Sequence, residues 1–562
     1  MVRAHTHVLQ ATEPIERTVR HRSGPKASYD VAMLGRRAGL VIGVAALASA
    51  CSSADAGGAT GSSPTERDAT TTTTTSAADD ATAGPTGTEP GVARPTAAPS
   101  EPVPVFEPAA IDWEQFDDEV DVGTLEVPID YSDPDGPTIG LFMARYNAID
   151  PENRIGTLLI NRGGPGFGGA EYAKIASFVF DQPLLERFDI VGWDPRGVGE
   201  SAPAIDCISD YDPYFNELDS TPETDEERQR LVDTAEQFAA ECVRLNADIV
   251  EHVGTNNSAR DMDTIRRAIG EDTISYYGFS YGSELGGVWT TLFPDTVRAA
   301  VFDGAADPAA DPLESSLQQN AGFEAALTTF LARCSGDDEC AFHNDGDAEG
   351  AFDALLAELD ETPLASPADR PPVNLDVATT AVRQAMYLET YWPALELSLA
   401  AAQDGDGSGL LALNDRYYQR APDGTYGNEL EAFQAISCAD SDVRKSVEET
   451  DGETELYTEV APRLVPENSA GGYFCTFFPP AIDPRLEITG AGAGPIVVIG
   501  TTGDPATPFE STVRMADTLE DGRLVLVEAD RHTGYGVNRC VVDVVNDYLI
   551  DLEAPDDGTE CR

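Results

Sequence analysis

Short apolar runs that alternate with segments of helical spacing are the feature that most limits how this chain can fold. The runs lie at residues 156–160, 188–193, 274–278, 298–304, 495–500 and 523–529. Strands that alternate with helices in this way predict an α/β fold, with a mostly parallel sheet and helices on both faces. Two earlier runs, 120–130 and 138–148, flank the turn-rich "YSDPDGP" and predict an antiparallel opening to the sheet.

The pattern changes between residues 309 and 490. Apolar residues there recur at helical spacing, as in Phe323, Leu327 and Phe330, and no clear strand interrupts them. The segment therefore predicts a large, mainly helical cap inserted into the core. The α/β core is then divided into a first part, 105–308, and a C-terminal part, 491–562.

The N-terminal 50 residues are expected to hold an export signal and an upstream extension. In "MLGRRAGLVIGVAALASAC", residues 33–51, two arginines precede an apolar stretch that ends in small residues, which is the layout of such a signal. The apolar stretch is too short for a stable membrane span. Met33 would be a natural start, so translation from Met1 and translation from Met33 both stay open.

Cys51 is the predicted lipid anchor. The stretch Ala48-Ser-Ala-Cys51 resembles a bacterial lipobox, in which the cysteine becomes the lipidated first residue. That pattern prefers leucine where this chain has Ala48, so ordinary cleavage after Ala50 remains the alternative. Residues 51–104 are rich in Ser, Thr, Ala and Pro and predict a flexible tether. We expect a cell-envelope protein anchored to the outer face of the cytoplasmic membrane, or otherwise a secreted one.

The cysteines fit an exported chain. Without Cys51, eight of the nine remain: Cys207, Cys242, Cys334, Cys340, Cys438, Cys475, Cys540 and Cys561. An even number in an exported protein predicts disulfides, although eight cysteines allow about 105 connectivities. We favour the pairing of neighbours in chain order, because two of those pairs flank polar, loop-like sequence. No C-x-x-C pair occurs, so no metal site is expected.

The charge balance excludes one class of partner. Lys and Arg number 36 and Asp and Glu 99, which gives 36 − 99 = −63. A field of this sign repels nucleic acid and anionic lipid head groups, so we expect no nucleic-acid partner and membrane contact through the N-terminal anchor only.

Ser280 is the predicted nucleophile. It lies in Gly278-Phe-Ser-Tyr-Gly282, a G-x-S-x-G that leaves a predicted strand and opens a predicted helix. Such a turn exposes the serine hydroxyl, and the flanking glycines relieve crowding. A serine hydroxyl is a weak nucleophile and needs a base.

His532 is the predicted base, and Asp504 is favoured as its acid. His532 lies in "EADRHTGYG", directly after the last predicted strand, and the expected chain order is Ser, acid, His. Asp504 in "VVIGTTGDPATP" follows the first strand after the cap. Asp303, at the end of the preceding predicted strand, is the competitor. Either acid would fix the imidazole tautomer and stabilise the imidazolium.

The loop "NRGGPGFGGA", residues 161–170, allows two interpretations. From Gly164 it spells G-x-G-x-x-G, as in a dinucleotide-binding loop, and Asp194 could serve as the ribose acid. Pro165, however, lacks an N–H group. In a serine hydrolase the same loop supplies an oxyanion donor, and we favour Gly164 and Tyr281 as the donors. No cofactor is then expected.

Four motifs in order resemble the tripeptidyl aminopeptidase branch of the α/β-hydrolase serine exopeptidases, which is related to prolyl iminopeptidases. They are "NRGGPGFGG", "GWDPRGVGES", "YYGFSYGSELGGVWTTLFPDTVRAAVFDGAADP" and "VVIGTTGDPATP…EADRHTGYG". The likeness is strongest to exported actinobacterial cell-envelope members and covers about residues 105 to 562. By this resemblance Ser280, Asp504 and His532 match the catalytic triad, and Asp194-Pro-Arg-Gly matches a D-x-R-G segment lining the site.

Two departures from the family pattern stand out. The family loop often has His, Asn or Gln at its start, where this chain has Arg162 directly before Gly163, and Arg531 replaces the glycine that commonly precedes the histidine. Neither change removes a catalytic atom, but both could alter leaving-group preference.

The resemblance implies an aminopeptidase that acts on peptide or protein substrates and releases short peptides, such as tripeptides, through an acyl-enzyme on Ser280. An acidic group then holds the substrate's free α-amine, and Asp440 and Glu284 are the candidates. Two alternatives remain at this point: an esterase or lipase-like hydrolase that uses the same residues, and a non-catalytic surface binding lipoprotein.

Overall fold

The structure, a computed structural model, describes residues 106–562. The predicted export signal, the lipid anchor at Cys51 and the tether lie outside the described residues. Within residues 106–562, no helix combines the length and the apolar character needed to span a membrane.

One sheet organises the described part of the chain. Its strand order is β1-β2-β3-β5-β4-β6-β7-β8-β9-β10. The bounds are β1 Glu114–Gln115, β2 Val120–Pro128, β3 Thr138–Tyr146, β4 Gly156–Asn161, β5 Phe188–Trp193, β6 Ile274–Phe279, β7 Val297–Asp303, β8 Ile496–Thr501, β9 Gly522–Val527 and β10 Thr559–Cys561. Pairing is antiparallel from β1 to β5 along this order and parallel from β5 to β10. The predicted strands and the antiparallel opening are confirmed.

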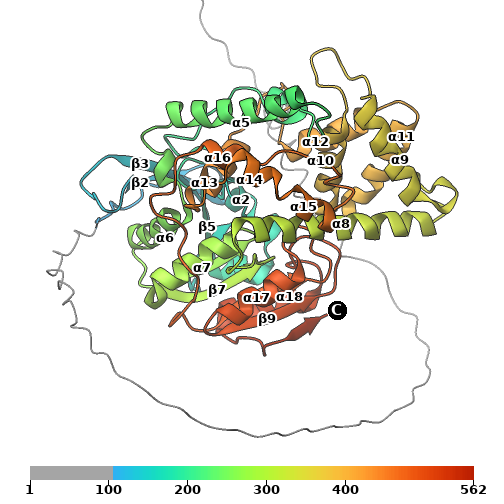
Figure 1. Cartoon of the computed structure of the whole chain (residues 1–562). Coiled ribbons are helices and arrows are strands. Elements are labelled where there is room, and N and C mark those ends of the chain that lie inside the picture. Colours follow the sequence, from blue (N-terminus) through green and yellow to red (C-terminus); the bar gives the residue numbers. More distant parts are fainter. Residues whose placement is uncertain (1–105) are drawn as a thin grey trace, which may run out of the picture. The chain divides into compact units, whose positions relative to one another are not determined.

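Helices cover both faces of the sheet (Figure 1). Alternate strand residues face opposite sides, so that Leu159 and Tyr276 lie in one apolar cluster and Leu158 and Tyr277 in another. The first cluster includes α5 Asp225–Leu245, α6 Thr255–Ile269, α7 Gly282–Leu292 and α17 Phe509–Thr518. The second includes α2 Ala170–Lys174, α4 Gln182–Arg187 and α18 Arg539–Asp551. This is the predicted α/β fold.

The predicted helical cap lies between β7 and β8. Its helices are α8 Pro312–Gly336, α9 Ala348–Glu361, α10 Leu375–Met386, α11 Trp392–Gln403, α12 Ser408–Tyr417, α13 Glu429–Ala439, α14 Val447–Asp451, α15 Thr454–Val460 and α16 Phe474–Phe477. Helices α8 to α12 enclose an apolar cluster of their own, which includes Phe330 and Phe352. Helix α13 instead packs into the core of the sheet through Ala435 and Ile436. The insertion therefore has a separate lobe and a part that is fused to the α/β core.

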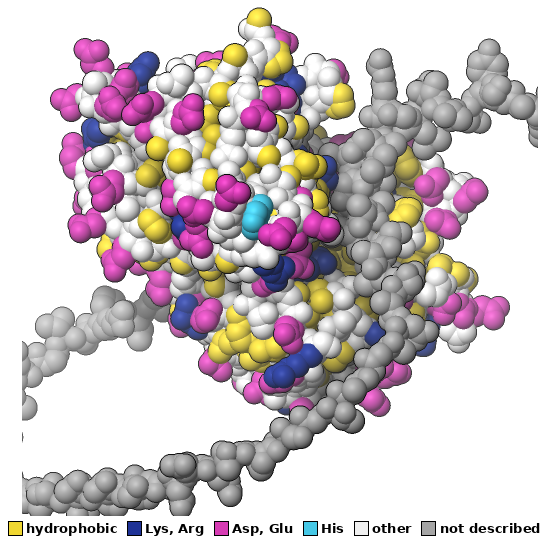
Figure 2. All heavy atoms as spheres, turned by 90° about the vertical axis from the view of Figure 1, so that its right-hand side faces the viewer, with side chains coloured by type: hydrophobic (Ala, Val, Ile, Leu, Met, Phe, Trp, Pro, Cys, Tyr) yellow, Lys and Arg dark blue, Asp and Glu magenta, His cyan; other side chains and the backbone are white. Residues whose placement is uncertain are grey.

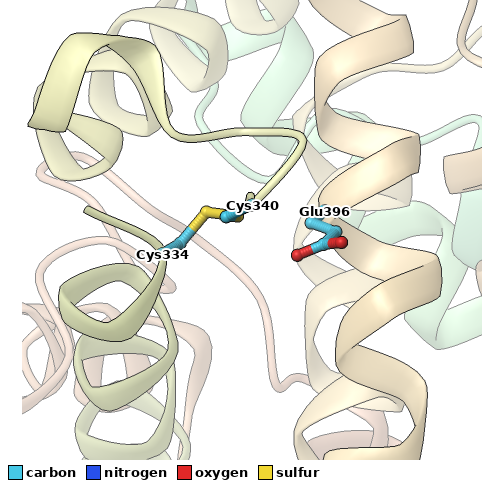
Figure 3. Close-up of side chains that lie close together, drawn as sticks. All are labelled: Cys334, Cys340 and Glu396. Atoms are coloured by element: carbon cyan, nitrogen blue, oxygen red, sulfur yellow. A yellow bond between two sulfur atoms is a disulfide. The ribbon is translucent and has the colours of Figure 1, made fainter. Parts of the chain in front are cut away.

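The disulfides follow the favoured pairing of neighbours. They join Cys207 to Cys242, Cys334 to Cys340, Cys438 to Cys475 and Cys540 to Cys561. Figure 3 shows the second pair beside Glu396 of α11, with the sulfurs and a carboxylate oxygen within 4.8 Å of one another. Because metal ligation by cysteine requires the thiolate, oxidised sulfurs do not make this group a metal site.

Acidic side chains are numerous on one face of the molecule. Figure 2 shows many Asp and Glu side chains, and fewer Lys and Arg, on the side of the molecule where α9 and α11 lie. The excess of acidic side chains on this face agrees in sign with the net charge of −63 of the full sequence.

A buried ion pair joins the sheet to α6. Arg196 donates to both carboxylate oxygens of Asp261, at 2.8 and 2.6 Å, and the two side chains are 2% and 0% exposed. The same guanidinium donates to the carbonyls of Pro128, Ile129 and His252. The arginine of the D-x-R-G segment thus stabilises the interior of the fold, because nearly all its donors bind acceptors there.

We expect Arg196→Met to lower the free energy of unfolding by about 3–5 kcal/mol, because it leaves the Asp261 carboxylate buried without its counter-charge. Urea denaturation measures this value. Arg244→Met removes an exposed arginine that pairs with Glu241 and should change stability little. Equal effects of the two changes would contradict this account of the buried pair.

Candidate active site

Ser280 occupies a strained turn between β6 and α7. Its φ of 55° is in the left-handed region, which is unusual for a residue other than glycine. A Cβ added at Gly278 would lie 2.3 Å from the carbonyl oxygen of Gly282, and one at Gly282 would lie 2.9 Å from that of Asn161. Glycine is therefore required on both sides of the serine for the strand to turn directly into the helix.

Asp303, the last residue of β7, fixes two loops at once. Its backbone carbonyl accepts a hydrogen bond of 2.8 Å from the N–H of Ser280. Its buried carboxylate accepts from the N–H groups of Gly534 and Tyr535, at 2.6 and 2.9 Å, and from the hydroxyl of Tyr277 at 2.9 Å. Burial raises the pKa of Asp303, and these donors act in the opposite direction. Asp303 thus holds the loop after His532 beside the serine turn, and it makes no hydrogen bond to the imidazole.

The imidazole of His532 is bound by Asp504. Its Nδ1 lies 2.8 and 3.0 Å from the two carboxylate oxygens. The carboxylate is fully buried and also accepts from the N–H groups of Ala506, Thr507 and Thr533. These contacts fix the carboxylate toward Nδ1, so that Nε2 is the nitrogen left for proton transfer. Of the two acids that the sequence allows, only Asp504 hydrogen-bonds to the imidazole.

Two further residues hold the histidine and were not anticipated. Thr507 Oγ1 lies 3.3 Å from Nδ1, and the N–H of His532 donates to the carbonyl of Tyr387 at 3.0 Å. The ring of Tyr387, which follows α10 of the cap, packs edge-on against the imidazole with 5.6 Å between centroids. Thr507 follows Asp504 by three residues in the same short loop, so its position in the sequence could have predicted a contact with the histidine. Tyr387 gives no such signal, because only the folded cap brings it here.

The backbone at Gly304 places the imidazole beside the serine turn. A Cβ added at Gly304 would lie 3.0 Å from Cε1 of His532, and the preceding residue, Asp303, binds the N–H of Ser280. Nε2 of His532 is buried and has no hydrogen-bond partner among residues 106–562. A serine–histidine hydrogen bond is therefore not formed in this structure. In free enzymes such bonds often tighten only when the substrate binds.

The glycine loop lies against the serine. A Cβ added at Gly163, whose φ is 95°, would lie 2.8 Å from Cβ of Ser280 and 3.2 Å from the nitrogen of Tyr281. The N–H of Gly163 donates to Asn161 Oδ1 at 2.9 Å. The N–H groups of Gly164 and Tyr281 donate to no acceptor in the described part of the chain. Both predicted oxyanion donors are thus free to receive a ligand oxygen.

Asp194 holds this glycine loop. Its carboxylate accepts from the N–H groups of Ala170 and Glu200, at 3.1 and 2.9 Å, and a Cβ added at Gly168 would lie 2.3 Å from Oδ1. Burial raises the pKa of Asp194 to about 6. Because this carboxylate is bound by its own chain, it does not have the free oxygens that a ribose-binding acid needs.

The two candidates for binding a substrate amine already have partners. Asp440 accepts from the N–H and the hydroxyl of Thr255, at 2.6 and 2.5 Å, and burial raises its pKa to about 6. Glu284 forms an ion pair of 2.6 Å with Arg485. The hydroxyl of Thr255 also lies 2.5 Å from that of Tyr281, so both acids adjoin the serine turn from the side of α6 and α7.

Comparison with known proteins places the chain in a family. The family described as "TAP-like protein" matches residues 467–561, which include Asp504 and His532. The chain is 35% identical to "Serine protease Hip1" of Mycobacterium tuberculosis, over 78% of this chain and 86% of that protein. It is 35% identical to "Carboxylesterase B" of the same species, over 78% and 85%. It is 29% identical to "Tripeptidyl aminopeptidase" of Streptomyces lividans, over 79% and 84%.

Among solved structures, the proline iminopeptidase of Mycobacterium smegmatis is similar at 14% identity, over 76% of this chain and 99% of that one, with a TM-score of 0.33.

The sheet order, the helical cap and the serine turn define the chain as an α/β hydrolase. Within that class it belongs to the tripeptidyl aminopeptidase-like serine peptidases of actinobacteria. The chain is thus a serine peptidase with peptide or protein substrates, which excludes the non-catalytic alternative.

We expect Gly163→Ala to slow the reaction with a fluorophosphonate probe by at least about tenfold, because the added Cβ would push the loop away from the serine, and the loss of one oxyanion donor alone costs about 2.7–4 kcal/mol. Gly270→Ala is the matched control. Gly270 also has a positive φ, but a Cβ there meets nothing within 4 Å. Labelling that slows equally in both variants would indicate general strain rather than this contact.

Proposed function

We propose that the protein is an exported aminopeptidase that releases short peptides, tripeptides in particular, from the N-termini of its substrates. The observation that carries the proposal is the pairing of Asp504 with Nδ1 of His532, with Nε2 buried and unpartnered beside the strained turn of Ser280. The cap above this site and the relative named tripeptidyl aminopeptidase support the exopeptidase part.

The proposed reaction is acyl transfer through Ser280. Its hydroxyl attacks the carbonyl carbon of the scissile bond while Nε2 of His532 accepts the proton. The N–H groups of Gly164 and Tyr281 stabilise the oxyanion, each by roughly 3 kcal/mol in the transition state. His532 then returns the proton to the leaving amine. Water hydrolyses the acyl-enzyme by the same steps, which regenerates the free serine.

An aminopeptidase also needs a group that binds the substrate's α-ammonium. Asp440 and Glu284 remain candidates, but an ammonium at either would compete with Thr255 or Arg485. Glu429, at the start of α13, forms no ion pair, although its carboxylate accepts from its own N–H group and faces the charge of Arg162. Its Oε2 is buried without a hydrogen-bond partner among the described residues, and its backbone carbonyl lies against Gly166 of the glycine loop. We add Glu429 as a third candidate for this role.

Export and lipidation at Cys51 are part of the proposal. The signal-like stretch at 33–51 supports them, and the disulfides of the described part are a second support, because such bonds persist in oxidising compartments.

We expect Ser280→Ala and His532→Ala to lower kcat by about 10⁶-fold, and Asp504→Ala by about 10⁴-fold, since the acid orients the base rather than transferring the proton. Steady-state hydrolysis of a peptide substrate measures these losses, and thermal unfolding checks that each variant is folded. His252→Ala is the control, because only the backbone carbonyl of His252 contributes to the Arg196 contacts. A fully active Asp504→Ala would return Asp303 to the role of acid.

We expect a tripeptidyl anilide with a free α-amine to be cleaved at least about 30-fold faster, by kcat/KM, than its N-acetylated form, because the acetyl group removes the charge that a buried carboxylate would bind. Glu429→Gln should narrow this ratio if Glu429 is the group. Equal rates for the two anilides would contradict the exopeptidase proposal.

The relative named carboxylesterase B favours a second function, ester hydrolysis at the same serine. Efficient turnover of acyl esters by a preparation that cleaves no peptide amide would establish that alternative.

A further inference from the structure

Two arginines beside the proposed catalytic groups have no carboxylate partner in the described structure. Arg162 directly precedes Gly163, and Arg531 directly precedes His532. Neither forms an ion pair or donates a side-chain hydrogen bond to a residue in 106–562, and Nε of Arg531 is buried without a partner. Other half-buried arginines, such as Arg154 and Arg485, have carboxylates at 2.5 to 2.7 Å. Arg420, in the cap, likewise forms no ion pair among the described residues, but Arg162 and Arg531 are the two that directly adjoin the glycine loop and the base.

The guanidinium of Arg162 lies against two aromatic rings, Phe167 and Tyr172. Cζ of Arg162 lies 4.9 Å from the ring centroid of Phe167 and 5.9 Å from that of Tyr172. Burial raises the pKa of the Tyr172 hydroxyl, and the charges of both Arg162 and Arg531 act in the opposite direction. The same ring packs edge-on against Phe279, the residue before Ser280, at 5.6 Å. Arg162 therefore lies beside the end of β6 that carries Ser280, and Arg531 directly precedes the base His532.

The other carboxylates near these arginines already form hydrogen bonds or ion pairs with other groups. Asp303 binds Gly534, Tyr535 and Tyr277, and Asp504 binds His532. Glu389 forms an ion pair of 2.7 Å with Arg333.

Glu429 is the remaining acid that faces Arg162. Burial raises the pKa of Glu429, and its own N–H group and the charge of Arg162 act in the opposite direction, but the two side chains form no ion pair within 4 Å. The described part of the chain therefore supplies no direct counter-charge for Arg162 or Arg531.

We propose that Arg162 and Arg531 form an anion subsite that binds a carboxylate of the substrate next to the scissile bond, so that the enzyme prefers peptides with Asp or Glu at that position. This inference rests on the proposed peptidase function of Ser280. The planar guanidinium matches a carboxylate in two hydrogen bonds, and such charge-assisted bonds are strong where water is partly excluded. An overall charge of −63 repels anions, so an acidic substrate needs a local positive site of this kind to bind.

The test uses pairs of peptides that differ only by Glu or Gln at one position, because this change alters charge at nearly constant shape. One pair varies the residue whose carbonyl is attacked, and the other varies the residue that follows the scissile bond. For the wild-type protein, we expect kcat/KM to be at least about tenfold higher for the Glu peptide of one pair, and this preference to fall as salt rises. The pair that responds identifies the side of the bond on which the subsite acts.

Arg162→Gln and Arg531→Gln should each reduce the Glu-to-Gln ratio severalfold, and the double variant should bring it near one. Both values of kcat/KM in this ratio are measured with the same variant, so a general loss of activity does not alter the ratio. Arg187→Gln is the matched control for charge. Arg187 ends α4, directly before β5 and thus at the amino end of that strand, where it donates to the carbonyl of Asn153. It should leave the ratio unchanged.

A second measurement needs no peptide cleavage. N-acetylglutamate should slow fluorophosphonate labelling of the wild-type protein at concentrations where N-acetylglutamine does not, and Arg162→Gln should remove this difference. If peptides are not cleaved but this competition is seen, the peptidase proposal fails while the anion subsite stands. Equal kcat/KM for all Glu and Gln pairs in an active enzyme, or equal competition by the two ligands, would overturn the subsite.

Discussion

The structure around the site depends on a single residue at the end of β7. The carbonyl of Asp303 binds the N–H of Ser280, and its carboxylate binds the N–H groups of Gly534 and Tyr535. One residue thus fixes the serine turn and the histidine loop relative to each other, although 252 residues (532 − 280) separate the serine and histidine along the chain. Because the carboxylate is buried, the loss of any of these donors would leave an unsatisfied charge, which makes the arrangement rigid.

The features of the fold and of the site that could be predicted from the sequence are those that depend on local patterns of residues. Strand and helix periodicity is a property of neighbouring residues, and it located the central strands and the helical cap. The serine turn, Asp504 and His532 each follow a strand, so the parallel order of β6, β7, β8 and β9 brings them to one edge. The short strands β1 and β10 were missed, since two or three residues carry no periodicity.

What the sequence could not supply are contacts between distant segments. Asp303 resembles a catalytic acid in its position after a strand, and only the hydrogen bonds to Gly534 and Tyr535 reveal its other role. Asp194 likewise fits a nucleotide site by spacing, yet it holds the glycine loop. Tyr387 reaches the imidazole from the cap, and no local signal connects it to His532. Each depends on long-range packing that periodicity does not encode.

The cap joins the core through α13 as well as through its ends. The side chain of Asn428 donates to the carbonyls of Gly197 and Ile205 and accepts from the N–H of Gly199. The backbone of Glu429 lies so close to Gly166 that a Cβ there would be 2.4 Å from its carbonyl oxygen. Helix α13, which would contact the substrate, is thus packed against the glycine loop, which would bind the oxyanion. The two are therefore positioned together.

The most direct test of this account is a crystal structure of the protein after reaction with a fluorophosphonate. We expect phosphorus bonded to Oγ of Ser280, with a phosphoryl oxygen within hydrogen-bonding distance of the N–H groups of Gly164 and Tyr281. We also expect Nε2 of His532 to lie within hydrogen-bonding distance of Oγ while Nδ1 remains bound to Asp504. Phosphorus on a different serine, or an imidazole turned away from the adduct, would contradict the central claim that these residues act together.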